Sequence, residues 1–74
     1  MSMIDEAFAA MTDTLAAIDE MVKMYSLLEY VGEGRSATWG RLVAAMDEQG
    51  IAWRGYGSFA EEAFQRAWPK GYND

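Results

Sequence analysis

The feature that most constrains the fold is an apolar repeat in the first third of the chain. Apolar residues recur at alternating steps of four and three, at Ile4, Phe8, Met11, Leu15, Ile18, Val22 and Tyr25. A repeat of 3.5 residues held over three heptads predicts a long amphipathic helix with one apolar side. We expect this helix over residues 3–31, ended by Gly32 and Gly34, because glycine accepts the left-handed conformation that ends many helices.

The length of this helix raises the question of what covers its apolar side. A helix of this length would reach about 42 Å, whereas a compact domain of 74 residues is only about 30 Å across. The helix can pair with a second copy, break near Thr12–Thr14 where β-branched residues flank a good N-cap, or dock on another protein. We favour a homodimer, with self-association through Phe8, Met11, Leu15, Ile18, Val22 and Tyr25.

The opposite side of the same helix is acidic. Its acidic residues recur at intervals close to seven and are interrupted by one base, Lys23; they are Asp5, Glu6, Asp13, Asp19 and Glu20. Residues 1–33 carry the whole net charge of −6, and residues 34–74 are neutral overall. Two interpretations stay open: a solvated face that keeps the protein in solution, or an anionic docking ridge for a basic partner surface.

The next segment predicts a second helix over residues 37–49. Ser36 or Thr38 can cap its start, and Gly50 followed by Ile51 is typical of a Schellman end. Gly40 lies inside this helix, where glycine costs about 1 kcal/mol relative to alanine. We expect the close approach of another backbone to compensate for it.

A third helix is predicted over residues 59–68, followed by a tail over residues 69–74. Ser58 and Glu61 have the S-x-x-E spacing of a capping box, which predicts where this helix starts. Together these patterns predict a single domain over residues 1–74. We expect an all-α protein with one long N-terminal helix and two shorter helices, joined by Gly-rich turns.

The segment between the two shorter helices is rich in aromatic residues and glycine. Trp53, Arg54 and Tyr56 stand among the glycines of A-W-R-G-Y-G. In one interpretation the aromatic rings cover a small core and Arg54 stacks on one of them as a cation–π pair. In the other the three residues form an exposed partner-binding loop, because Trp, Tyr and Arg dominate interface energetics.

The composition argues against catalysis. The chain has no histidine and no cysteine, which removes the commonest general base, nucleophiles and metal ligands. The adjacent acids Glu61 and Glu62 point about 100° apart on a helix and do not form a catalytic pair. We predict no enzymatic activity, no metal and no cofactor. No apolar run is long enough for a membrane span, and the N-terminus lacks the basic flank of a signal peptide, so we expect a cytoplasmic protein.

Residues 36–68 resemble the helix-turn-helix segments of small phage and plasmid accessory proteins. In the first of the two helices, the shared features are an opening Trp (Trp39) and a Gly-Ile end (Gly50, Ile51). A turn with a basic residue and Gly follows (Arg54, Gly55). The second helix then has a Ser-Phe start (Ser58, Phe59) and an Arg-Ala-Trp end (Arg66, Ala67, Trp68). The resemblance implies an origin in a mobile element. Two departures disfavour DNA binding: the turn is longer than the usual three or four residues, and Glu61 and Glu62 open the would-be recognition helix.

Three functional hypotheses follow. The first is a small acidic protein–protein interaction module, of the kind that phages encode to inhibit host defence (anti-CRISPR-like or anti-restriction-like). It would block the basic surface of a nucleic-acid-binding complex. The alternative is a helix-turn-helix DNA-binding accessory protein that dimerises through its first helix, which requires the bases Arg35, Arg41, Arg54, Arg66 and Lys70 to gather on one face. Direct nucleic-acid binding is disfavoured by the charge balance. The third is a purely structural oligomerisation module.

Overall fold

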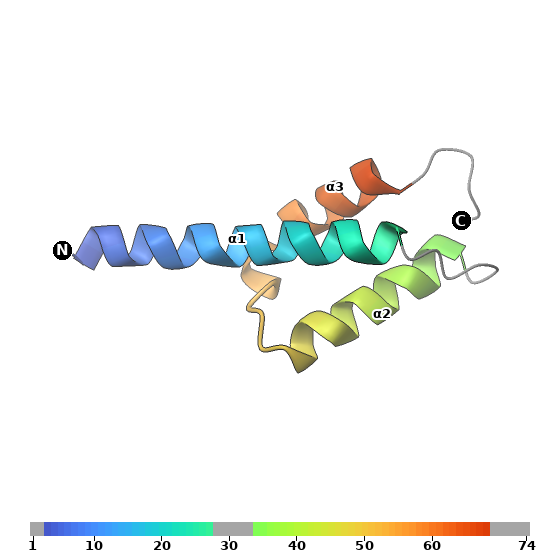
Figure 1. Ribbon diagram of the computed structural model, residues 1–74, viewed down its shortest axis with the longest axis horizontal. Coiled ribbons are helices and arrows are strands. Elements are labelled where there is room, and N and C mark those ends of the chain that lie inside the picture. The colour runs from blue at the N-terminus through green and yellow to red at the C-terminus, as the bar shows by residue number, and fades with distance from the viewer. Residues whose placement is uncertain (1–2, 28–33, 69–74) are drawn as a thin grey trace.

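The computed structural model describes residues 3–27 and 34–68, and every regular element in these ranges is helical. The elements are α1 (Met3–Leu27), α2 (Gly34–Glu48), the short 3₁₀ helix η1 (Arg54–Tyr56) and α3 (Gly57–Ala67) (Figure 1). The prediction of a small all-α protein with one long N-terminal helix and two shorter helices is confirmed. From the end of α1, α2 runs back beside it, and α3 then runs in the same sense as α1 (Figure 1).

The first helix is continuous over 25 residues, so the alternative of a break near Thr12–Thr14 is wrong. The Thr12 and Thr14 hydroxyls donate to the backbone oxygens of Phe8 and Ala10, at 2.9 and 3.0 Å. Each hydroxyl thus has a hydrogen-bond partner one turn earlier in the same helix. Neither threonine therefore acts as the N-cap of a new helix. The predicted last turn, residues 28–31, lies outside the described residues, as does Gly32.

The second helix starts at Gly34 rather than at residue 37. Neither expected cap acts there: Ser36 and Thr38 both lie inside the helix, and the buried Thr38 Oγ1 donates to the Gly34 backbone oxygen at 2.8 Å. Gly34 has a φ of 85°, in the left-handed region that glycine occupies at little cost. Gly40 is exposed, and a Cβ there would meet nothing within 4 Å, so the expected backbone approach is wrong.

The end of α2 is the Schellman motif that the Gly50-Ile51 pair predicted. The Ile51 N–H donates to the Met46 oxygen at 2.9 Å, and the Gly50 N–H donates to the Asp47 oxygen at 3.1 Å. Gly50 has a φ of 74°, in the left-handed region that glycine occupies without strain. Ile51 packs against the core cluster that contains Met46, which supplies the apolar contact of the motif.

The third helix starts at Gly57, directly after η1, and not through the expected capping box. Tyr56 occupies the N-cap position and makes no side-chain cap hydrogen bond, so Ser58 already lies inside the first turn. The helix ends at Ala67, and Trp68 is extended with φ −67° and ψ 130°. That conformation is the one required of a residue that precedes proline, here Pro69.

The core lies where the three helices meet, at the C-terminal half of α1. Its fully or nearly buried apolar residues are Ile18, Met21, Val22, Leu42, Met46, Ala60, Ala63, Phe64 and Trp68. Trp39 joins α2 to α3, because its ring lies 5.3 Å from the Phe64 ring. Among residues 4–17 of α1, none is buried. The molecule is therefore elongated, with principal extents of 48 × 23 × 17 Å.

Candidate interaction surfaces

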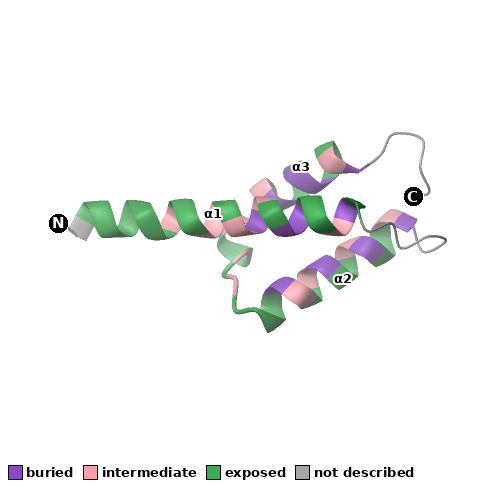
Figure 2. Cartoon of the chain, in the orientation of Figure 1, coloured by how far each residue is buried: buried purple, intermediate pink, exposed green. Residues whose placement is uncertain are grey.

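The N-terminal half of α1 is the less covered half: none of residues 4–17 is buried, and we call these residues the projecting half. It accounts for about 21 Å of helix. Residues 4–10 are all exposed, including two large apolar side chains, Ile4 at 80% and Phe8 at 65% (Figure 2). Large apolar residues are normally covered when they follow one another along a helix face, so this half of α1 offers a surface that the bundle does not use.

The apolar row of the projecting half consists of Ile4, Phe8, Met11 and Leu15. Met11 and Leu15 are half-buried, and the row continues without a change of spacing into Ile18 and Val22, which are 0% exposed. Ile18 and Val22 are enclosed by α2 and α3 of the same chain, so they are not available for the self-association that the sequence predicted. Tyr25 is half-buried and packs against the same core. Of the residues predicted for self-association, Phe8 is thus open to a partner, and Met11 and Leu15 are open in part.

The five acids of the predicted ridge lie on two lines of α1. Three of them form a row without ion pairs among the described residues, and the other two lie beside it. Glu6, Asp13 and Glu20, which we call the acidic row, are seven residues apart and lie along one line of the helix over about 21 Å. All three are exposed, and none forms an ion pair within residues 3–27 and 34–68. Glu6 and Asp13 each follow a member of the apolar row by two positions, about 200° around the helix. The acidic row therefore faces away from the apolar row.

Asp5 and Asp19 belong to a different line, about 100° away from the acidic row. Asp19 is paired with Lys23 one turn later, with 2.9 Å between Oδ2 and Nζ. An exposed pair of this kind is screened by water and adds little to stability. Its consequence here is electrostatic, because Lys23 cancels one of the five charges that the sequence grouped into a single ridge.

Asp47, at the end of α2, binds the loop that carries Trp53, Arg54 and Tyr56. Arg54 donates two hydrogen bonds to the Asp47 carboxylate, Nη1 to Oδ1 at 2.6 Å and Nη2 to Oδ2 at 2.9 Å. The Trp53 indole Nε1 donates to the same Oδ1 at 3.0 Å. These bonds lower the pKa of the Asp47 carboxyl below its ordinary value, the Arg54 bonds first and the Trp53 bond second. Sequence reasoning missed Asp47, although it lies only one turn before the Schellman glycine.

The rings of this loop cover the core, as the first of the two interpretations expected. Trp53 packs edge-on against Trp39, with ring centroids 5.9 Å apart and an interplanar angle of 88°. The Arg54 guanidinium carbon lies 4.8 Å from the centre of the Trp53 ring, which is the expected cation–π pair. Tyr56 is half-buried and packs against the same core. A role of Trp53, Arg54 and Tyr56 in partner binding stays a prediction.

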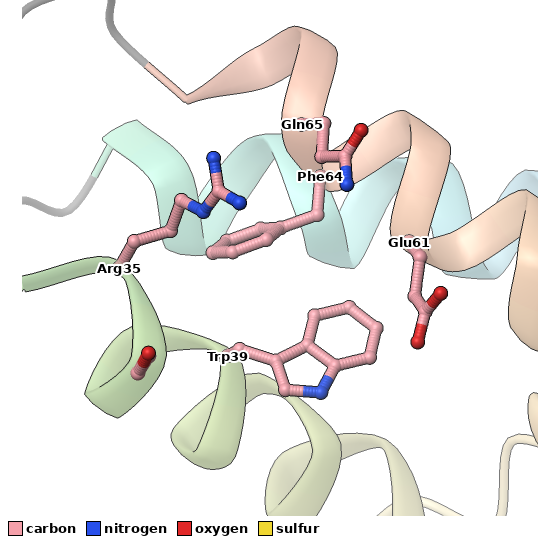
Figure 3. Close-up of a pocket in the computed structure, with 6 residues that line it drawn as sticks. Arg35, Trp39, Glu61, Phe64 and Gln65 are labelled. Carbon is pink, nitrogen blue, oxygen red and sulfur yellow. The ribbon is translucent and has the colours of Figure 1, made fainter. Parts of the chain in front are cut away.

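A groove between α2 and α3 was not anticipated from the sequence. It has a volume of about 320 Å³ and is lined by Arg35, Ser36, Trp39, Glu61, Phe64 and Gln65. Figure 3 shows the Trp39 and Phe64 rings side by side, with Arg35 and Glu61 at opposite ends. The lining thus combines two aromatic rings with one basic and one acidic side chain. In the sequence, the four-residue spacings of Arg35 with Trp39 and of Glu61 with Gln65 place each pair on one face of a helix. Only the fold brings the two pairs together.

Neither metal ligation nor a membrane span is visible in the described part of the chain. No group of three or more acidic, histidine or cysteine side chains is placed to hold a metal ion there. Of the helices in residues 3–27 and 34–68, none combines the length and the apolar character needed to cross a bilayer.

The segment that resembles a helix-turn-helix has two helices at about the expected places, but its details differ from a DNA-reading unit. The helices are separated by residues 49–56, and Glu61 and Glu62 are exposed on α3. Of the five bases required on one face, Arg54 is engaged by Asp47, and Lys70 lies outside the described residues. Comparison of the chain with protein-family models, curated proteins and solved structures finds no match, so its function has to be inferred from these surfaces.

Proposed function

We propose that the protein is a non-enzymatic interaction module that binds a basic protein surface through the acidic row of α1. The observation that carries this proposal is the position of Glu6, Asp13 and Glu20. They are exposed, lie on one line and have no ion pair among the described residues. Two of the three stand on the projecting half, where α2 and α3 do not restrict access.

The acidic row faces away from the apolar row, so the projecting half can present it to a basic surface while another helix covers the apolar row. The acidic row sets one carboxylate about every 10 Å along the helix. Lysine and arginine residues that normally hold phosphates would then meet carboxylates instead. Such contacts steer association and weaken as salt rises, because exposed charges are screened beyond about 8–10 Å.

The partner that this chemistry fits is a nucleic-acid-binding complex, whose phosphate-binding surface is basic. In the biological setting that the resemblance implies, the protein would be a phage or mobile-element inhibitor of host defence, acting like an anti-CRISPR or anti-restriction protein. Its mechanism would be steric and electrostatic: occupation of the phosphate-binding surface excludes the nucleic acid.

The proposal is tested by competition between the protein and nucleic acid for purified RNA-guided nucleases and restriction complexes. We expect displacement of the nucleic acid at about 50 mM salt and at least tenfold weaker displacement at about 300 mM. Combined Glu6→Lys, Asp13→Lys and Glu20→Lys substitutions should abolish it. The matched control carries the same change of charge on α2 and α3, at Glu48→Lys, Glu61→Lys and Glu62→Lys, and should retain activity. Equal loss in both variants, or displacement insensitive to salt, would contradict a role for the acidic row.

A further inference from the structure

The apolar row of the projecting half is the uncovered continuation of a strip that helices already cover. From Ile4 to Val22 the strip keeps its steps of four and three. At its far end Ile18 and Val22 are 0% exposed beneath α2 and α3, whereas Ile4 and Phe8 remain 80% and 65% exposed. Because helices cover one end of this strip, we expect a helix to be able to cover the exposed end as well.

We propose that a second copy of this chain covers the apolar row, with the two projecting halves packed side by side and antiparallel. A parallel pair is excluded by the fold, because α2 and α3 occupy the side of α1 that carries Ile18 and Val22. Two parallel copies would bring both bundles onto the same seam at the same level. In the antiparallel pair the two bundles lie at opposite ends, and only the projecting halves meet.

The spacing defines one symmetric register for this pair. With a two-fold axis between Ala9 and Ala10, Ile4 lies opposite Leu15 of the second copy and Phe8 lies opposite Met11 of the second copy. All four residues of the apolar row then have an apolar partner. The flanking positions on the seam include Ala7, Thr12 and Thr14, which are small or uncharged and allow the helices to approach.

The charges also favour the antiparallel arrangement. The acidic row lies about 200° from the apolar row, so it points away from the seam in both copies. Asp5, which lies closer to the seam, would stand beside its counterpart in a parallel pair. In the antiparallel pair the two Asp5 residues are about 13 Å apart along the axis, which exceeds the screening length of about 8–10 Å.

The area available predicts a weak dimer. The exposed parts of Ile4 and Phe8 offer roughly 300 Å² per copy, judged from the 150–250 Å² that an aromatic side chain buries. With the half-buried Met11 and Leu15 the total for two copies reaches roughly 800–1,000 Å², at the lower end for specific interfaces. We therefore expect dissociation in the range of about 10–100 µM.

Analytical ultracentrifugation from about 1 µM to about 1 mM tests the dimer. The wild-type chain should pass from monomer to dimer across this range. Phe8→Glu should remain monomeric throughout, because it places a charge at the centre of the seam. Ala9→Glu adds the same charge on the next residue, about 100° away from Phe8, and should dimerise like the wild type. A wild-type monomer at 1 mM, or a Phe8→Glu dimer of undiminished strength, would overturn the proposal.

Cysteine cross-linking tests the orientation, since the natural chain has no cysteine. In an oxidised equimolar mixture of Ile4→Cys and Leu15→Cys chains, the 4–15 disulfide should predominate. A 4–4 disulfide should be scarce, because the two Ile4 positions are about 16 Å apart along the axis and a disulfide needs Cα atoms within about 7 Å. A predominant 4–4 product would show a parallel pair and overturn the proposed arrangement. The triple reversal of the acidic row should leave dimerisation intact, so failure of the dimer and failure of the proposed function are distinguishable.

Discussion

The two halves of α1 have the same apolar spacing but different neighbours. Ile4 and Ile18 are the same residue type in the same helix, yet Ile4 is 80% exposed and Ile18 is 0% exposed. The difference arises from the lengths of the neighbours, because α2 has 15 residues and α3 has 11 beside the 25 of α1. An amphipathic repeat thus shows that a helix face needs cover, and not whether the same chain provides it.

The two halves also differ in what stabilises them. In the bundle, which α2, α3 and the C-terminal half of α1 form together, burial of a side chain such as Ile18 or Phe64 contributes about 1.5–3 kcal/mol. Residues 4–10, which are all exposed, lack this contribution. Their helix depends on propagation from the bundle, which costs little once a helix is nucleated. Its composition suits that role, since alanine, the best helix former, recurs at Ala7, Ala9 and Ala10.

The largest expected effect contrasts two phenylalanines, one in each region. Phe64 is 4% exposed and Phe8 is 65% exposed. Phe64→Ala should lower the free energy of unfolding by about 3–5 kcal/mol, because it removes a buried ring and leaves a cavity. Phe8→Ala should change it by less than about 0.5 kcal/mol. Urea denaturation at low micromolar concentration measures both, and similar losses from the two substitutions would show that the projecting half is packed in the monomer.

A smaller effect on the free energy of unfolding is expected at the turn that ends α2. This turn determines how far α2 runs along α1. Gly50→Ala should lower the free energy of unfolding by about 1–2 kcal/mol, because its φ of 74° is strained for any residue with a Cβ. Gly40→Ala should raise it by up to about 1 kcal/mol, since that glycine is exposed in a helix with open space around it. Thermal denaturation should therefore shift in opposite directions for the two variants, and a shift of the same sign would contradict the Schellman geometry.

The smallest expected effect is a pH dependence of the bundle that arises from Asp47. The folded pKa of Asp47 is lowered by its hydrogen bonds from Arg54 and Trp53, so this contact stabilises the fold above the ordinary carboxyl pKa. Its contribution is lost as the pH falls through the lowered value. Asp47→Asn should be less stable than wild type at pH 7, with the difference shrinking in strong acid. Urea titrations of the two proteins at several pH values measure this difference, and a gap that stays constant down to strong acid would contradict the contact.

The sequence predicted the elements better than the contacts between them. The heptad repeat indicated α1, and Gly50-Ile51 indicated the end of α2, because these signals depend on residues close in the chain. The start of α2 was missed because the helix begins at Gly34, before Ser36 and Thr38, the polar residues that would signal a cap. The start of α3 was missed because the 3₁₀ turn of η1 enters the helix directly.

The candidate surfaces were harder to predict than the helices, because they depend on contacts between residues far apart in the sequence. The acids were found, but their division into an unpaired row and a line partly neutralised by Lys23 follows from helix geometry and the pairing of Asp19. The bidentate contact of Arg54 with Asp47 and the groove that includes Trp39 and Glu61 join segments that only the fold brings together. Which part of the apolar strip stays open depends on how far α2 and α3 reach.

That the N-terminal half of α1 is helical yet uncovered can be measured most directly by NMR at the lowest practicable protein concentration. Backbone chemical shifts should be helical from residue 4 to residue 27, while a soluble paramagnetic agent should broaden the Ile4 and Phe8 side-chain signals strongly and leave Ile18 and Val22 almost unaffected. Equal protection of Ile4 and Ile18 in the dilute monomer, or non-helical shifts before residue 15, would contradict the projecting helix on which both proposed interactions depend.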